Sequence, residues 1–133
     1  MSTFCQTYVA IVDADASSCR ALSRLLSAEG IQSVIYPSAE DFLGDTKQPR
    51  FDCLLLDVRL GGLSGIELHQ RLKASGSSIP VIYLTADDEP QARQQAEAAG
   101  CVAYFRKTAP GREVIRSIRN AIHPDRDPSP KSL

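Results

Sequence analysis

The sequence predicts an α/β protein with a doubly wound, five-stranded parallel sheet in the order 2-1-3-4-5, folded as a single domain. Three observations lead to this prediction. Short apolar runs alternate five times with amphipathic stretches, which is the pattern of repeated βα units. The runs are apolar almost without interruption, as is typical of parallel strands that are buried on both faces. The length of 133 residues is that of one ordinary domain.

Five apolar runs are the expected strands, and several of them end at residues that can do chemistry. The run at 51–56, FDCLLL, is the most apolar and ends directly before Asp57. The first run is followed by Asp13, the fourth by Thr85, and the fifth ends near Lys107. The expected strands comprise residues 8–12, 31–36, 51–56, 80–84 and 102–105.

The stretches between the runs have the apolar spacing of helices that pack on a sheet. Capping-box patterns that start at Ser38 and Ser64 open the second and third helices. The expected helices comprise residues 17–29, a short segment after Pro37, 64–72, 89–99 and 111–122. The polar, proline-rich segment 124–133, PDRDPSPKSL, is expected to be a disordered tail or a linker that follows a domain of residues 1–123.

Composition and charge argue against several classes of protein. The net charge of −1 and the pI of about 6.1 leave no basic stripe for nucleic acid. No apolar run reaches the roughly 18 residues that span a bilayer, and the start MSTFCQTY lacks the regions of a signal peptide. Without CxxC spacing, the cysteines are expected to be small buried side chains in a reducing cytoplasm. They are Cys5, Cys19, Cys53 and Cys101; His69 and His123 are expected at the surface.

Four polar residues follow the predicted strands at one edge of the sheet, where open α/β sheets bind their ligands. Asp13 and Asp57 would be neighbours there, flanked by Thr85 and Lys107. Clustered carboxylates call for a cation, and Mg²⁺ prefers oxygen ligands. The lysine and the hydroxyl suit a phosphoryl group, and a carboxylate beside them can act as its nucleophile. Asp57 is the best candidate, because it follows the most buried strand and precedes a glycine-rich loop.

Four motifs occur around these residues in a fixed order: YVAIVDAD, FDCLLLDVRLGGLSGIEL, IPVIYLTADD and GCVAYFRKT. Together they resemble the receiver domain of bacterial two-component response regulators, which has a flavodoxin-like fold. The resemblance covers residues 7–123 without insertions. It is closest to the branch of nitrogen-fixation regulators, whose output domain is a LuxR-type helix-turn-helix.

The resemblance implies a role for each residue of the site. Asp57 would be the phosphoacceptor, phosphorylated by a histidine kinase in a Mg²⁺-dependent reaction. Thr85 would be the switch hydroxyl, the Ala86 backbone N–H would contact the phosphate, and Lys107 would pair with it. Tyr104 would be the aromatic residue that changes rotamer.

The resemblance also implies a metal site and an output face. Asp13, Asp57 and the backbone carbonyl of Arg59 would hold Mg²⁺. The face formed by residues 89–99, 102–105 and 111–122 would contact a second copy or an output domain. No contact with nucleic acid or membrane is implied for this part of the protein.

Three residues depart from the family pattern around the site. Ala14 stands where the family has a second acid that contacts Mg²⁺. Three outcomes are open: Asp13 binds the ion directly, Asp15 lends a carboxylate, or Mg²⁺ binding and phosphorylation are impaired. Asp15 also suits a helix cap. Thr108 replaces the usual proline after the lysine, which favours a trans bond, and Gly61 replaces another proline.

Two other functions compete with a phosphorylated receiver, which is not itself an enzyme. The first is a degenerate, phosphate-independent receiver that acts as a protein-interaction module, as the three departures suggest. The second is a haloacid-dehalogenase-like phosphatase, because VAIVDADAS resembles that family's motif, with Asp13 as nucleophile and Asp15 as acid/base. Against it, the segment after the first expected strand enters a helix at once and leaves no room for that family's flap. Asp57 would also have no role.

Overall fold

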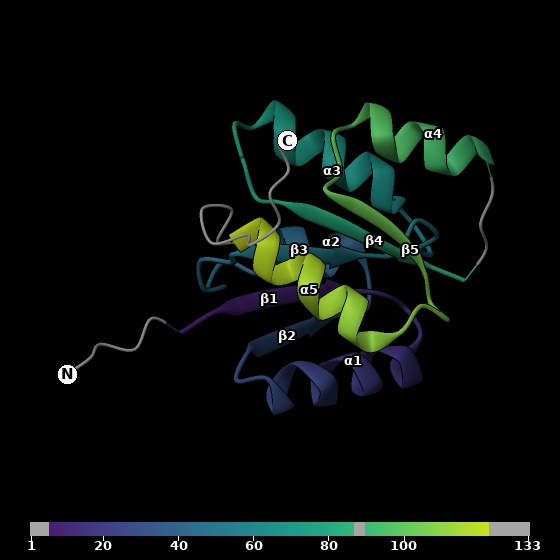
Figure 1. Cartoon of the computed structure of the whole chain (residues 1–133). Coiled ribbons are helices and arrows are strands. Elements are labelled where there is room, and N and C mark those ends of the chain that lie inside the picture. The colour runs from purple at the N-terminus through teal and green to yellow at the C-terminus, as the bar shows by residue number, and fades with distance from the viewer. Residues whose placement is uncertain (1–5, 87–89, 123–133) are drawn as a thin grey trace, which may run out of the picture.

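The computed structural model describes residues 6–86 and 90–122. The expected start of a helix at Glu89, the tail at 124–133, Cys5 and His123 lie outside these ranges. Five parallel strands form one sheet in the order β2-β1-β3-β4-β5, which confirms the predicted topology (Figure 1). The strands are β1 (Tyr8–Val12), β2 (Gln32–Tyr36), β3 (Cys53–Leu56), β4 (Val81–Thr85) and β5 (Ala103–Arg106).

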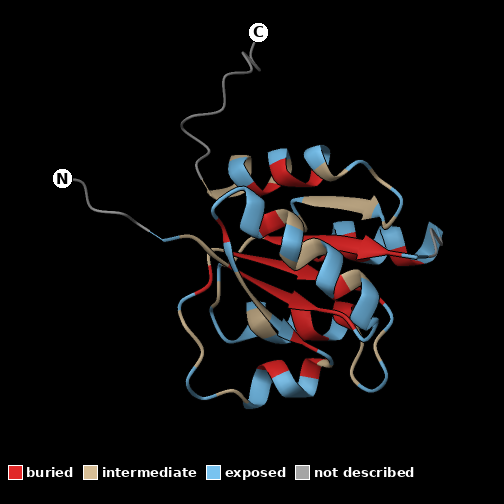
Figure 2. Cartoon of the chain, turned by 90° about the horizontal axis from the view of Figure 1, so that it is seen from below, coloured by how far each residue is buried: buried red, intermediate tan, exposed pale blue. Residues whose placement is uncertain are grey.

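The helices cover the sheet on both faces. Their bounds are α1 (Ala16–Ala28), α2 (Ala39–Gly44), α3 (Gly65–Ala74), α4 (Pro90–Ala98) and α5 (Gly111–Ile122). One apolar cluster packs α2, α3 and α4 against the sheet, and a second packs α1 and α5 against its other face. In Figure 1, α5 crosses in front of the sheet. Figure 2 shows the inner strands buried along their length, as parallel strands covered on both faces must be.

The expected helix ends are close to the observed ones because the capping residues act as predicted. Ser64 and Glu67 form a complete capping box at the start of α3. Ser38 accepts a hydrogen bond from the Asp41 backbone N–H at the start of α2. Gly30 follows α1 with φ of +77°, a left-handed conformation that glycine adopts without steric cost. Most remaining boundaries shift by one or two residues.

The prediction that His69 lies at the surface is wrong. The residue is 4% exposed, and its Nδ1 lies 3.0 Å from the Tyr83 hydroxyl. The reason is helical spacing: His69 falls one turn after the buried Ile66, on the face of α3 that meets the sheet. Two cysteines do behave as predicted, since Cys19 and Cys53 are free and buried. No helix in the described ranges is long and apolar enough to cross a membrane.

Candidate functional site

The sheet positions the two central acids by extending its hydrogen bonds one residue beyond the strands. The Asp13 N–H donates to the Tyr36 carbonyl, and the Asp57 N–H donates to the Val12 carbonyl, each at 3.0 Å. Val12 and Leu56 are paired in the β1–β3 register, so the acids that follow them start from adjacent points. Both residues are buried, with Asp13 4% and Asp57 8% exposed.

Lys107 reaches the same point from the end of β5. Its backbone N–H donates to the Thr85 carbonyl at 2.8 Å, which ties the lysine to the end of β4. Its Nζ lies 2.8 Å from Asp13 Oδ2 and 3.2 Å from Asp57 Oδ2. One ammonium therefore bridges two carboxylates, and the structure brings together the three charged residues that the sequence predicted for this edge.

The charges at this site do not balance. Burial raises the pKa of Asp57, and the negative charge of Asp13 raises it further, whereas Lys107 and the Arg59 N–H oppose the shift. Burial lowers the pKa of Lys107, but its hydrogen bond to Asp13 and the charges of both acids outweigh burial, so the net shift is upward. With both acids ionised the cluster has one negative charge in excess, which favours the approach of a cation.

The remaining oxygens of the two acids accept backbone hydrogen bonds. Asp13 Oδ1 accepts from the Asp15 N–H at 3.0 Å, and Asp57 Oδ1 accepts from the Arg59 N–H at 3.2 Å. These bonds hold each carboxylate in one orientation and place the Arg59 backbone next to Asp57. The Arg59 carbonyl is thus on the loop that leaves the acid, where the sequence analysis expected a metal ligand.

Asp15 is engaged elsewhere. It is the N-cap of α1, and its carboxylate accepts from the Ser17 N–H at 3.0 Å and the Ser18 hydroxyl at 3.1 Å. The hydrogen bonds from Ser18 lower the pKa of Asp15. The helix-cap alternative is therefore the one that the structure shows. The side chain of Ala14 is exposed and provides no ligand.

The donor set fits a magnesium ion with few protein ligands. Mg²⁺ is commonly held by one or two carboxylates and completes its shell with water and substrate oxygens. The carboxylates of Asp13 and Asp57 alone meet that minimum, and the Arg59 carbonyl stays a predicted ligand. Across residues 6–86 and 90–122, no group of three or more His, Cys, Asp or Glu side chains is placed to hold a metal.

The loop after Asp57 is shaped by Gly65 at the start of α3 and by an acid from α2. A Cβ on Gly65 would lie 2.0 Å from the Asp57 carbonyl oxygen, so α3 approaches the acid too closely for any side chain there. Glu40 accepts a hydrogen bond from the Leu63 N–H at 2.8 Å. A Cβ on Gly62 would come within 2.6 Å of the Glu40 carboxylate. Sequence reasoning missed Glu40, because nothing along the chain connects it with residues 62–63.

The predicted switch residues lie on the side of the site formed by β4 and β5. Thr85 ends β4 and is 2% exposed, and Ala86 follows it directly. Tyr104 is half-buried in β5 opposite Tyr83, with ring centroids 6.0 Å apart. The guanidinium of Arg93, on α4, lies 5.3 Å from the Tyr104 ring centroid.

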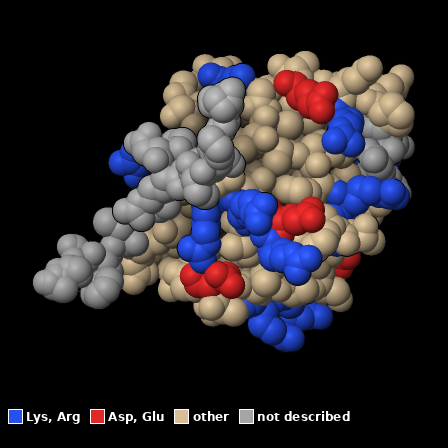
Figure 3. All heavy atoms as spheres, viewed as in Figure 1, with Lys and Arg blue, Asp and Glu red and all other residues tan. Residues whose placement is uncertain are grey.

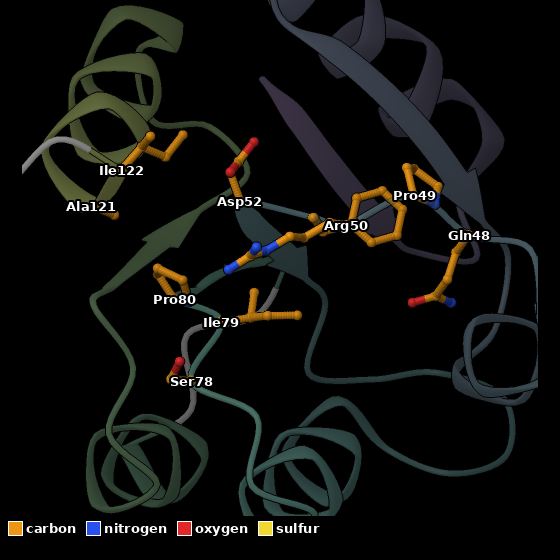
Figure 4. Close-up of a pocket in the computed structure, with 10 residues that line it drawn as sticks. Gln48, Pro49, Arg50, Asp52, Ser78, Ile79, Pro80, Ala121 and Ile122 are labelled. Carbon is orange, nitrogen blue, oxygen red and sulfur yellow. The ribbon is translucent and has the colours of Figure 1, made fainter. Parts of the chain in front are cut away.

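A separate hollow of about 370 Å³ lies at the opposite edge of the sheet, near the amino ends of β3 and β4 (Figure 4). Arg50, Asp52 and Ile122 are among its lining residues. Asp52 already accepts the Tyr8 N–H at 3.0 Å, so its charge serves the start of β1. Asp52 is the single acid among the residues that line this hollow, so the hollow lacks a pair of acids such as Asp13 and Asp57.

The face that carries α5 has mixed charge. Arg112, Arg116 and Arg119 are exposed along α5, and the Arg119 guanidinium lies 2.7 Å from the Glu29 carboxylate. Figure 3 shows basic and acidic side chains interspersed on this face. Such a surface differs from the continuous basic stripe of proteins that bind nucleic acid through phosphate contacts.

Comparison with known proteins gives a consistent family. Residues 9–119 match the response regulator receiver domain. The chain is 33% identical to the response regulator protein TodT of Pseudomonas putida over 112 residues, which are 84% of this chain and 49% of TodT. It is 30% identical to the transcriptional regulatory protein FixJ of Bradyrhizobium diazoefficiens over 125 residues, 94% of this chain and 60% of FixJ. The chain therefore spans about half the length of these relatives.

Solved structures agree with the fold. The response regulator receiver protein from Burkholderia phymatum superposes with a TM-score of 0.76 at 40% identity. The match covers 88% of this chain and 95% of the Burkholderia chain. The crystal structure titled FixJ-N gives a TM-score of 0.81 at 28% identity and covers 90% of this chain and 96% of its own.

Proposed function

Because this chain belongs to the receiver-domain family of response regulators, we propose that it accepts a phosphoryl group on Asp57 from a histidine kinase. The observation that carries the proposal is the bridge from Lys107 to both Asp13 and Asp57. An ammonium held between two buried carboxylates, on a residue whose backbone N–H is bonded to the Thr85 carbonyl, supports the binding of phosphoryl oxygens at this point. Receiver domains are in general signalling proteins rather than enzymes, and this role fits that description.

The proposed step transfers a phosphoryl group from the donor atom to an oxygen of Asp57. An oxygen of ionised Asp57 attacks the phosphorus of the donor, and a new P–O bond forms as the bond to the donor atom breaks. With phosphohistidine, the electron pair of the broken P–N bond returns to the imidazole; with acetyl phosphate, acetate leaves. The product in both cases is an acyl phosphate on Asp57.

The residues around Asp57 stabilise the charge that arrives. Lys107 is close enough to move from the carboxylate oxygen to a phosphoryl oxygen with a small change of side-chain angle. Thr85 ends β4 and Ala86 follows it, so the Thr85 hydroxyl and the Ala86 N–H would donate to the other oxygens. Each such donor is worth most in a site that excludes water, and Asp13, Asp57 and Thr85 are all buried residues.

Metal binding is where we expect this chain to differ from its family, because Ala14 replaces an expected acid. Mg²⁺, when bound, supplies charge neutralisation for the phosphoryl oxygens. Asp13, Asp57 and the Arg59 carbonyl would hold it, and Ala14 adds nothing to that set. Lys107 is already paired with Asp13, so a cation competes with an existing ion pair. We therefore expect weak Mg²⁺ binding and slow phosphorylation.

The test is phosphorylation of the intact chain. The protein is incubated with acetyl phosphate and Mg²⁺ and weighed by mass spectrometry, with Asp57→Asn as the matched control. We expect a gain of one phosphoryl group that is absent from the control. A gain that persists in Asp57→Asn would contradict the assignment of the acceptor.

Ala14→Asp, tested in the same way, separates a working receiver from a degenerate one. Gain in the native chain means that the site tolerates Ala14. Gain in Ala14→Asp alone means that the metal site is the defective part, and favours the second candidate function. That candidate is a phosphate-independent interaction module, and it is favoured by the commitment of Asp15 to the α1 cap. The same commitment speaks against Asp15 as the acid/base of a phosphatase.

Phosphorylation would be communicated through the α4-β5-α5 face. The buried residues of α4 are the small side chains Ala92 and Ala96, so moving this helix disturbs little apolar packing. β5 is only half-buried, unlike the other strands that flank the site. We propose that this face contacts a second copy or an output domain, as the greater length of the relatives suggests.

A further inference from the structure

Three aromatic rings run in sequence from α3 to β5 beneath the helices α3 and α4. His69 belongs to α3, Tyr83 to β4 and Tyr104 to β5. The His69 and Tyr83 ring centroids are 5.8 Å apart, and those of Tyr83 and Tyr104 are 6.0 Å apart. His69 is thus two contacts away from the predicted switch residue.

The first contact is a buried hydrogen bond. His69 Nδ1 and the Tyr83 hydroxyl are 3.0 Å apart, and Tyr83 is completely buried. Burial lowers the pKa of His69, with the charge of Lys73 acting in the same direction, so the ring is held in its neutral form. A hydroxyl at this depth loses its solvation on folding and depends on its partner, which gives the bond a strong orienting effect on Tyr83.

The second contact is a ring against a ring. Tyr83 and Tyr104 are paired residues of adjacent parallel strands, and their ring planes are inclined by 39°. Side chains of paired residues lie on the same face of a sheet, so the Tyr83 ring forms part of the wall beside Tyr104. Arg93 contributes another part of that wall.

We propose that His69 is a positioning residue for Tyr104 and acts through Tyr83. The hydrogen bond to His69 holds the Tyr83 ring in one orientation, and that ring defines the space in which Tyr104 changes rotamer. Without the bond, the Tyr83 hydroxyl must seek another partner, and its ring moves into or away from the volume that Tyr104 uses. The inference rests on the proposed function only in its assignment of Tyr104 as the switch.

The surroundings of His69 are compatible with this role. The residue also lines a hollow of about 260 Å³ between α3 and the start of β5, together with Lys73 and Gly100. Lys73 donates to the Ala99 carbonyl at 2.8 Å, which closes the hollow against the end of α4.

The experiment follows the Tyr104 ring directly. The chain has four tyrosines and no tryptophan, so ring-labelled tyrosine gives a simple NMR spectrum, in which Tyr104→Phe identifies the Tyr104 signal. We compare the native chain with His69→Leu, His69→Asn and Tyr83→Phe. Asparagine places an amide near the position of the imidazole Nδ1 and keeps the hydrogen bond, whereas leucine removes it. Tyr83→Phe removes the hydroxyl but keeps the ring, and guards against a His69→Leu chain that fails to fold.

We expect the Tyr104 ring signal to shift or split by more than its linewidth in His69→Leu and Tyr83→Phe, and to return to the native position in His69→Asn. His69→Leu combined with Tyr83→Phe should move the signal no further than either change alone, because both remove one bond. A native Tyr104 signal in folded Tyr83→Phe, or an additive double variant, would overturn the inference.

Phosphorylation of Asp57 is measured on the same samples by intact mass. Failure of the mass gain counts against the proposed function, while the Tyr104 signal of the unphosphorylated chain still tests the role of His69. The two failures are therefore distinguishable.

Discussion

Two buried polar clusters lie on this sheet, and they differ in how their charge is satisfied. The cluster of Asp13, Asp57 and Lys107 has two acids for one base. The pair of His69 and Tyr83 is neutral and hydrogen-bonded. Burying an unbalanced charge costs free energy that packing alone does not return, whereas a satisfied neutral pair costs little. The unbalanced cluster therefore has the character of a binding site, and the neutral pair that of a positioning element.

Lys107→Met should have the largest effect, because it leaves two buried carboxylates facing each other. We expect the free energy of unfolding to fall by about 3 kcal/mol, the size seen when one partner of a buried ion pair is removed. Urea unfolding at pH 7 measures it. Lys73→Met is the matched control, since Lys73 is exposed and its ammonium bonds a single carbonyl. Equal losses in the two variants would mean that the acidic cluster has no special dependence on its lysine.

His69→Leu tests the neutral cluster in the same assay. It leaves the buried Tyr83 hydroxyl without its partner, and we expect a loss of about 2 kcal/mol. Adding Tyr83→Phe removes the stranded hydroxyl, so the double variant should lose less than the sum of the single variants. A strictly additive double variant would show that the bond contributes no coupling free energy.

Asp57→Asn should act in the opposite direction and sharpen the contrast. Burial and Asp13 raise the pKa of Asp57, so its ionised form destabilises the folded state. We expect the variant to be more stable at pH 7 by about 1 kcal/mol. The folded state binds the Asp57 proton more tightly than the unfolded state. The gain is therefore complete above the raised pKa and shrinks as the pH falls toward the ordinary value of 3.8.

Unfolding curves at pH 7 and at about pH 4 check this sign. Asp52→Asn is the control, because the Asp52 carboxylate accepts a hydrogen bond from the Tyr8 backbone N–H and is not paired with a second acid there. Asp52→Asn should not stabilise the chain at either pH. A gain for Asp57→Asn that grows on acidification would contradict the upward pKa shift.

The difference between the clusters also explains what the sequence could predict. The order of strands and the gathering of Asp13, Asp57 and Lys107 at one edge follow from connectivity, because parallel strands end on the same side. The ion pairs from Lys107 to Asp13 and Asp57 do not follow from connectivity. They depend on how far the lysine side chain extends from the end of β5 toward the ends of β3 and β1. The choice of Asp15 between metal ligand and helix cap was open for a similar reason and was decided by the local turn into α1.

His69 was missed because a polar residue in an amphipathic helix suggests the exposed side. The signal was present in its spacing from Ile66, but a histidine on an apolar stripe acquires meaning only with its partner, and Tyr83 is 14 residues away on a strand. Neutral buried pairs leave little trace in composition or charge. Clustered acids at strand ends do leave one, which is why Asp13 and Asp57 were predicted from the residues themselves, whereas Tyr104 was implied only by the family resemblance.

Ala14→Asp should have the smallest effect on stability without metal and the clearest response to it. Position 14 is exposed, so a third carboxylate beside Asp13 adds screened repulsion, and we expect a loss below about 1 kcal/mol without Mg²⁺. A ligand that binds only the folded state stabilises it by about 2.7 kcal/mol at 100 times its dissociation constant. At one Mg²⁺ concentration, the thermal midpoint should therefore rise more in Ala14→Asp than in the native chain.

The larger Mg²⁺ response of Ala14→Asp is informative only if the ion binds at the site of Asp13 and Asp57. In Ala14→Asp combined with Asp57→Asn, the response to Mg²⁺ should fall back toward that of the native chain, because one carboxylate has been gained and another lost. Ca²⁺, which prefers more oxygen ligands, should stabilise Ala14→Asp less than Mg²⁺ does. If the native chain already responds to Mg²⁺ as strongly as Ala14→Asp, then Asp13 compensates for Ala14 by binding the ion directly, and Lys107 must leave it to do so.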